Sequence, residues 1–213
     1  MTSKLKTLVA STSVMALLVS GAPAMADGTQ AGTSIENSVS VTYQVNGATQ
    51  TPPPVASDEF VVDRKIIFDV NATDGNSTVV NPNTTENVLT FTLENTSNDT
   101  LDFGISIANL ANGFSTTNGD AGADNYDATN IYYCVDNNGN SVCDAGEENV
   151  NVNNLAPDTS RTIWVYGDIP MTAPNSSVAA VSITAVGLDS AGVALTDDSG
   201  DLDDAAVLQY TGG

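Results

Sequence analysis

The sequence predicts an all-β protein, an immunoglobulin-like antiparallel β-sandwich with an N-terminal strand or hairpin joined to it by a proline-rich linker. Short segments alternate between apolar and polar residues, which is the period of a strand with one buried face. Gly, Asn, Asp, Ser and Thr separate these segments at close intervals, as turns do in sandwiches. Hardly any stretch has helical periodicity, so we expect about eight or nine strands.

The first half of the chain contains four alternating runs. They are residues 35–45, with Ile35, Val39, Val41, Tyr43 and Val45 on one face, then 60–70, 89–93 and 101–107. Later strands are expected at 131–135, 162–166, 177–186 and 205–210. The polar residues 95–100 lie between two of the runs, so they predict the turn of a hairpin.

Residues 51–57 contain Pro52, Pro53 and Pro54, which cannot join a central ladder and which favour an extended linker. The expected organisation is therefore a signal peptide at 1–26, an N-terminal strand or hairpin at 27–50, a linker at 51–57 and a sandwich at 58–213. Two interpretations of the first strand stay open. It is a detachable donor strand, or Asn46 and Gly47 form a tight turn and the segment pairs locally within its own sandwich.

Residues 1–26 have the features of a secretory signal, with Lys4 and Lys6 before an apolar stretch and an Ala-x-Ala pattern ending at Ala26. The apolar stretch, 8–19, is too short to span a bilayer comfortably. We expect a mature chain without membrane insertion that is secreted to the extracellular space or the cell surface rather than kept in the periplasm.

The chain is strongly acidic, with 26 Asp and Glu against five Lys and Arg. Cleavage after Ala26 leaves only Arg64, Lys65 and Arg161 as basic residues. Nucleic acid and anionic membranes need clustered Lys and Arg, so the composition excludes both as partners. It favours divalent counterions, and calcium is the expected one outside a cell.

The two cysteines, Cys134 and Cys143, are expected to form a disulfide, because an exported protein folds in an oxidising compartment. The bridge closes a loop of ten residues and is worth roughly 2–3 kcal/mol on the loop-entropy model. The disulfide is therefore a local cross-link within one loop.

The most specific motif is the loop 136–147, which has the ligand spacing of an EF-hand-type calcium loop. Ser141 replaces the usual glycine at position six, and no amphipathic helix flanks the loop. The alternative is a polar turn that is closed by the disulfide and holds no metal. Asp120, Asp124 and Asp127 precede the loop and could add ligands. The candidate calcium ligands are Asp136, Asn138, Asn140, the carbonyl of Val142, Asp144 and Glu147.

Catalysis is not expected. The chain has no histidine, so imidazole-based triads and the common zinc sites are absent. Many carboxylates are present, but nothing singles out two of them for glycoside hydrolysis. The single tryptophan, Trp164, is expected in the core. Asn-x-Ser/Thr sequences read as surface glycan acceptors in a glycosylating organism, and they occur at Asn71, Asn76, Asn83, Asn95, Asn98 and Asn175.

Several segments resemble a group of uncharacterised proteobacterial secreted proteins. Those proteins are similar to the conserved-repeat, immunoglobulin-like domains of prokaryotic surface proteins. The resemblance rests on residues 31–43, 61–65, 87–96, 136–147 and 155–161. It implies an extracellular structural role, since such domains occur in surface layers, adhesins and appendages, and it supplies no catalytic residues.

The leading hypothesis is a subunit of an extracellular filament or surface assembly. The N-terminal strand, with Ile35, Val39, Val41, Tyr43 and Val45, would complete a neighbour's sandwich, and head-to-tail donation of this kind generates a fibre. The alternative is a monomeric, calcium-stabilised binding or adhesion module of the cell surface. A carboxylate-based hydrolase is the remote alternative.

Overall fold

A computed structural model describes residues 28–40, 42–46, 48–49, 55–74, 78–113, 123–195 and 209–210. In this part of the chain there is no helix, and all strand pairs are antiparallel. The all-β sandwich predicted from the alternation is confirmed, whereas its immunoglobulin-like character stays a prediction.

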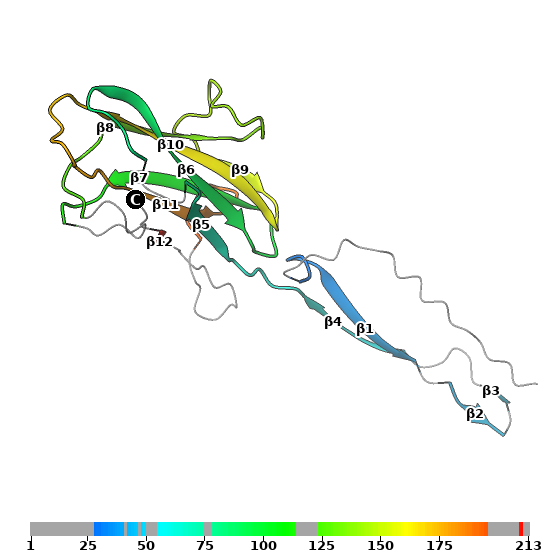
Figure 1. Cartoon of the computed structure of the whole chain (residues 1–213). Coiled ribbons are helices and arrows are strands. Elements are labelled where there is room, and N and C mark those ends of the chain that lie inside the picture. Colours follow the sequence, from blue (N-terminus) through cyan, green and yellow to red (C-terminus); the bar gives the residue numbers. More distant parts are fainter. Residues whose placement is uncertain are drawn as a thin grey trace, which may run out of the picture.

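Two four-stranded sheets face each other (Figure 1). The first has the order β5-β6-β10-β8 and the second the order β12-β11-β7-β9. Their strands are β5 (Phe68–Ala72), β6 (Thr84–Asn95), β7 (Leu101–Asn109), β8 (Thr129–Val135), β9 (Val152–Leu155), β10 (Thr159–Ile169), β11 (Val181–Leu188) and β12 (Gln209–Tyr210).

The core lies between the sheets and follows the alternation. Phe91 and Leu93 point inwards from β6, and Phe103 and Ile105 do so from β7. Ile163 and Val165 are buried on β10, so Trp164 between them lies on the outer face and is only half-buried. The core position expected for Trp164 is therefore wrong, because the register of β10 is set by its two aliphatic neighbours.

The hairpin predicted around residues 95–100 is wrong. β6 pairs with β5 and β10, whereas β7 pairs with β9 and β11, so the chain crosses from one sheet to the other at this point. The turn bonds to the segment before β5 instead, since the Thr96 amide donates to Ile67 O at 2.9 Å. We call residues 95–100 the corner.

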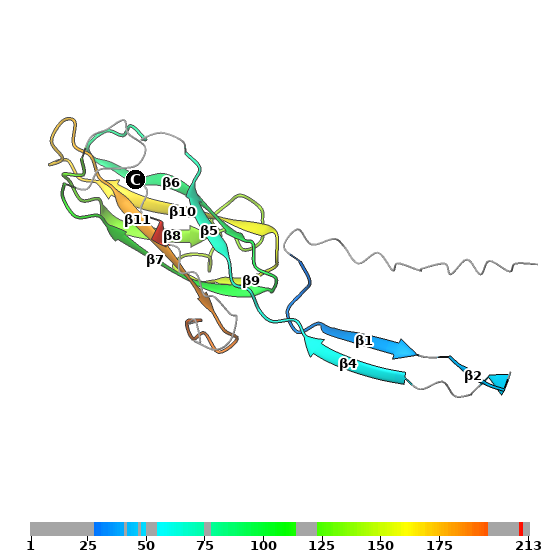
Figure 2. The ribbon, with the colours of Figure 1, turned by 90° about the horizontal axis from the view of Figure 1, so that it is seen from below.

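The first strand, β1 (Ser34–Ser40), pairs with β4 (Val55–Val61), and β2 (Gln44–Val45) pairs with β3 (Ala48–Thr49). We call the described residues between 28 and 61 the ribbon; it projects from one end of the sandwich (Figures 1 and 2). Asn46 is left-handed, with φ of 50°, as a two-residue hairpin turn requires. The local pairing is confirmed, but it lies outside the sandwich.

The predicted domain boundaries shift as a result. Residues 55–57 of the expected linker and 58–61 of the expected sandwich belong to β4. The first buried core residue is Ile66, so the sandwich begins near that position. The signal peptide and Pro52, Pro53 and Pro54 lie outside the described residues.

Candidate functional site

The two faces of the ribbon differ in composition, and we call the one with Ile35, Val39 and Phe60 the apolar face, although the Asn37–Asp58 pair lies at its centre. Directly paired residues share a face, and Ile35 pairs with Phe60 while Val39 pairs with Ala56. On the opposite face Glu36 pairs with Glu59, and the Ser34 hydroxyl donates a hydrogen bond to the Glu59 carboxylate. Two like charges in direct cross-strand contact destabilise a ribbon, so the pairing alone does not account for its stability.

The apolar face of the ribbon is uncovered. Val39 is 64% exposed and Phe60 is 56% exposed. Among the described residues eleven large apolar side chains are exposed, and six of them lie on the ribbon: Val39, Tyr43, Val45, Val55, Phe60 and Val61. Val55 and Val61 pair with Ser40 and Ser34, so these two lie on the face of Glu36 and Glu59. An isolated two-stranded hairpin is at best marginally stable in water. The ribbon therefore has the composition of an interaction surface. Val41, also expected on this surface, lies outside the described residues.

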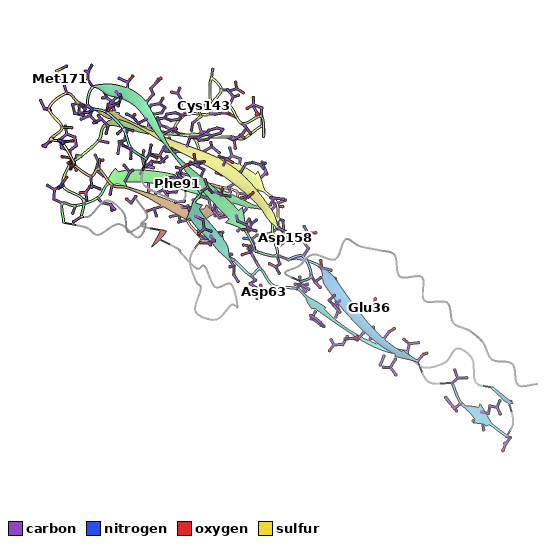
Figure 3. The ribbon with its side chains drawn as sticks, in the orientation of Figure 1. Glu36, Asp63, Phe91, Cys143, Asp158 and Met171 are labelled. Carbon is purple, nitrogen blue, oxygen red and sulfur yellow. A yellow bond between two sulfur atoms is a disulfide. The ribbon has the colours of Figure 1, made fainter. Side chains whose placement is uncertain are left out.

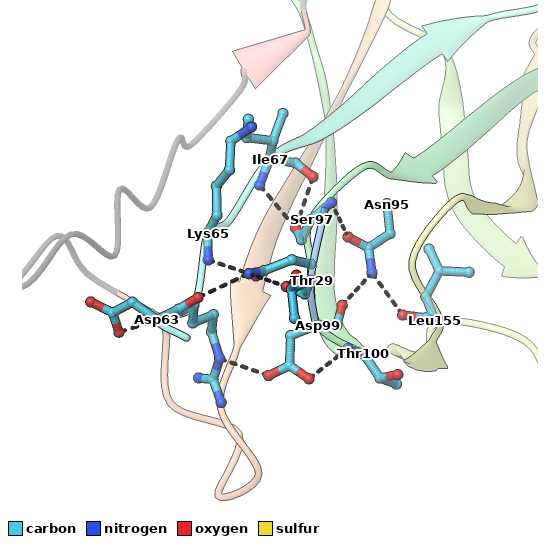
Figure 4. Close-up of polar contacts among 11 residues, drawn as sticks. Thr29, Asp63, Lys65, Ile67, Asn95, Ser97, Asp99, Thr100 and Leu155 are labelled. Carbon is cyan, nitrogen blue, oxygen red and sulfur yellow. Dashed lines mark hydrogen bonds and ion pairs between the residues drawn. The ribbon is translucent and has the colours of Figure 1, made fainter. Parts of the chain in front are cut away.

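Asn98 bonds the base of the ribbon to the corner, and Figure 4 labels its partners Thr29, Asp63 and Lys65. Its Nδ2 donates to Asp63 O at 2.9 Å and to Thr29 O at 3.2 Å, and its Oδ1 accepts from the Lys65 amide at 2.7 Å. The Ala31 amide donates to Asn98 O at 3.0 Å. One side chain thus bonds to the segment before β1 and to the segment after β4.

The loop 136–147 follows β8 and closes on itself. Asp136 and Glu147 are 6% and 7% exposed. Asp136 accepts from the Asn140 and Ser141 amides, both at 3.0 Å, and Glu147 accepts from the Asn137 and Asp144 amides, also at 3.0 Å. Ser141 has φ of 61°, so the sharp turn forms without the usual glycine.

A second group in the loop meets at Asp144. Its Oδ2 accepts from the side-chain amides of Asn138 at 2.8 Å and Asn140 at 2.7 Å. The structure therefore brings positions three, five and nine of the motif together, while positions one and twelve bond to backbone amides. Among the described residues no group of three or more His, Cys, Asp or Glu side chains is placed to hold a metal ion.

Asp124 does not belong to this loop. Its Oδ1 accepts from the Ala180 amide at 2.7 Å, which places it beside the start of β11. Asp124 and Asp127 precede β8 and the loop follows it, so the length of a seven-residue strand separates them. Asp120 lies outside the described residues.

The predicted disulfide is confirmed. Cys134 on β8 bonds to Cys143 in the loop, and no free cysteine remains among the described residues. The bridge ties the loop to the outer face of the first sheet, where Trp164 is the cross-strand neighbour of Cys134 (Figure 3 labels Cys143). Such a bond is typical of an oxidising compartment.

Aromatic side chains also lie on this outer face. The rings of Tyr132 and Tyr166 stack with centroids 4.9 Å apart. Burial raises the pKa of both phenols, and the negative charge of Glu86 adds to the effect. Next to them, Asp168 accepts from Asn130 Nδ2 at 2.8 Å and from the Glu86 amide at 2.9 Å.

The hydrogen bond from Asn130, followed by that from the Glu86 amide, lowers the pKa of Asp168. A lowered folded-state pKa stabilises the fold above the usual carboxyl pKa, and this stabilisation is lost as the pH falls through the lowered value. Asp168→Asn should therefore lower the melting temperature at pH 7, with the difference from wild type shrinking towards pH 2. Thermal melts across this range test it, and a difference independent of pH contradicts it.

The glycan prediction is corrected at two positions. Asn95 is 0% exposed and Asn98 is 9% exposed, and both donate to backbone carbonyls of the corner or ribbon base, so neither is a surface acceptor in the folded chain. Asn71, Asn83 and Asn175 are exposed, and Asn76 lies outside the described residues.

Sequence reasoning did not identify Phe60 or Val55 as ribbon residues, because they follow the proline-rich segment and were assigned to the sandwich or linker. The signal that could have found them is the match in length between residues 34–40 and 55–61 on either side of the Asn46 turn.

Comparison with protein-family models, curated proteins and solved structures found no match. No helix in the described part of the chain has the length and apolarity of a membrane span.

Proposed function

We propose that this protein is an exported structural subunit of an extracellular filament or surface assembly, and that it polymerises through its N-terminal ribbon. The observation that carries the proposal is the projecting two-stranded ribbon, on one face of which Val39 and Phe60 are exposed beside the half-buried Ile35. A protein that stays monomeric gains nothing from an exposed apolar face on a marginally stable hairpin, whereas a partner that covers this face stabilises both.

The form of donation differs from that of a lone strand. Because β1 is already paired with β4 along seven residues, the unit offered to a neighbour is a preformed ribbon rather than a free strand. Preorganisation reduces the entropy that association costs. The bonds of Asn98 to Thr29 and Asp63 support the observed arrangement, in which the ribbon projects from its own sandwich.

The test is negative-stain electron microscopy with light scattering on the mature chain in millimolar calcium. We expect fibres of uniform width from the wild type and dispersed particles from a variant that lacks residues 27–61. A deletion variant that forms the same fibres contradicts the ribbon mechanism. A wild-type chain that stays monomeric over a wide range of concentration and salt contradicts the filament function itself.

A second candidate function is a calcium-stabilised binding or adhesion module. It is favoured by the closed loop 136–147, in which Asn138 and Asn140 meet Asp144 within 2.8 Å and Ser141 adopts the turn that the motif needs. A hard cation at this point would replace the amide donors with their oxygens and take carboxylate from Asp144. Asp136 and Glu147, at the two ends of the loop, would then add negative charge near the cation.

Calcium binding to the folded chain should raise its melting temperature. At a hundred times the dissociation constant the gain is about 2.7 kcal/mol, which chelation removes. Asp144→Ala should abolish the calcium-dependent part of the shift. Asp189→Ala is the matched control, since Asp189 likewise accepts two hydrogen bonds in an exposed turn, here from backbone amides, but lies outside the loop. Equal melts of the wild type with calcium and with chelator contradict this function.

A further inference from the structure

The exposed apolar side chains are distributed unevenly over the sandwich and ribbon. Six of the eleven lie on the ribbon, and three more, Val79, Val88 and Met171, lie at or near the opposite end of the sandwich. Figure 3 shows Met171 at the end of the sandwich furthest from the ribbon residue Glu36. Only Val142 and Val193 remain elsewhere. The molecule therefore has two apolar ends.

The end opposite the ribbon has a cleft of about 490 Å³. It opens between the two sheets, where the first half of β6 and the end of β10 meet the segment before β11. Its walls are largely apolar, with Val79, Val88, Leu89 and Ile169 among the residues that line it, and Asn175 and Ser177 add polar groups. A cleft of this size also suits a small apolar ligand, which is the competing occupant.

The first half of β6 lies beside the cleft. β5 pairs with β6 only from Phe91 to Asn95, and the Thr73 amide extends the ladder by one bond to Thr90 O. In the described ranges no strand pairs with Thr84–Leu89 on the side away from β10, although Glu86 interrupts this edge, since its φ is 54° and its amide donates to Asp168. An open edge next to an apolar cleft is the arrangement that accepts an added strand, because main-chain bonds give affinity and the cleft receives alternate side chains.

We propose that this cleft and the free edge of β6 form the acceptor site for the ribbon of a second copy of the chain. The inference rests on the proposed filament function and names the partner surface that such a function needs. The ribbon leaves one end of the sandwich and the acceptor lies at the other, so one copy cannot satisfy both. The contact is heterologous, and repeating it adds copies without closing a ring.

A standard interface removes about 800 Å² from each partner. The ribbon offers two paired seven-residue strands for such a contact, and the exposed Val39 and Phe60 lie on the same face of it.

Three double variants with the same added charge test the proposal. The ribbon variant is Val39→Glu with Phe60→Glu, the cleft variant is Val79→Glu with Val88→Glu, and the control is Ala156→Glu with Val193→Glu. All six positions are exposed, so melting temperatures near that of the wild type are expected and are checked first. The control should form fibres like the wild type, and each of the other two should stay monomeric alone.

The decisive sample is the equimolar mixture of the ribbon and cleft variants. The intact cleft of the first can accept the intact ribbon of the second, so light scattering should give a discrete dimer and no fibre. A cleft variant that polymerises like the wild type overturns the acceptor site while the filament function stands, and this is the result expected if a small ligand fills the cleft. A monomeric mixture also overturns the acceptor site. A monomeric wild type overturns the filament function and the acceptor site with it.

A cross-linking measurement provides a readout that does not depend on the charged variants. Val39→Cys mixed with Val79→Cys under mild oxidation should give a mixed-disulfide dimer in at least tenfold higher yield than Val39→Cys mixed with Val193→Cys. Equal yields from the two mixtures overturn the proposed contact. The native cysteines are already paired with each other and do not compete.

Discussion

Asn95→Ala is expected to lower the free energy of unfolding by about 3–5 kcal/mol. Asn95 is fully buried in the corner, where its Nδ2 donates to Leu155 O at 2.8 Å and to Asp99 O at 2.9 Å. Its Oδ1 accepts from the Ser97 amide at 3.0 Å. Alanine leaves these backbone groups without a partner, and each unsatisfied buried group costs about 1–3 kcal/mol. Urea unfolding with an unchanged slope measures the loss.

The matched control is Asn71→Ala. Asn71 also donates through its amide, at 2.6 Å to Asp69, but it does so at the exposed surface, so its loss should change stability by less than about 0.5 kcal/mol. Asn95→Asp provides a second comparison, because the carboxylate still accepts from Ser97 while it faces the Leu155 carbonyl without a donor. If Asn95→Ala costs no more than Asn71→Ala, the corner does not depend on this side chain.

The strands were predictable from the sequence because burial of one face imposes a period of two, which Phe91, Leu93, Phe103 and Ile105 follow. The crossing between the sheets was not predictable from the sequence, because a hairpin and a corner place the same alternating residues in the core. What distinguishes them is the buried side chain of Asn95, which donates to the carbonyls of Leu155 and Asp99 at the end of β6. A polar residue at an inward position of a predicted strand end is therefore a signal of a corner.

The candidate sites also have some features that the sequence predicts and others that it does not. The loop 136–147 and its disulfide were predictable because ligand spacing and cysteine pairing are local properties of the sequence. The direction of the carboxylates of Asp136 and Glu147 was not, since it depends on which backbone amides the folded loop presents. The cleft was not predictable at all, because its walls come from several separate segments that only the sheet order brings together.

Phe103→Ala is expected to cost about 3–5 kcal/mol of stability, a large part of what a domain of this kind has. Phe103 on β7 is fully buried, and its ring meets that of Phe68 on β5 at a centroid distance of 5.0 Å and an angle of 67°. The pair joins the two sheets. Truncation removes the buried area, leaves a cavity and loses the edge-to-face contact.

Phe60→Ala is the control of identical chemistry, since Phe60 is 56% exposed on the ribbon and touches no core. Its loss should change the free energy of unfolding of the monomer by less than about 0.5 kcal/mol, measured by chemical denaturation.

The effects of the two substitutions on fibre formation should be reversed, with Phe60→Ala weakening assembly although its sandwich is intact. Below its own melting temperature, Phe103→Ala should still assemble, because its ribbon is unchanged. Two phenylalanines 43 positions apart in the chain would then separate the residues that hold the sandwich from those that join one copy to the next, and equal effects of both substitutions on assembly would contradict this division.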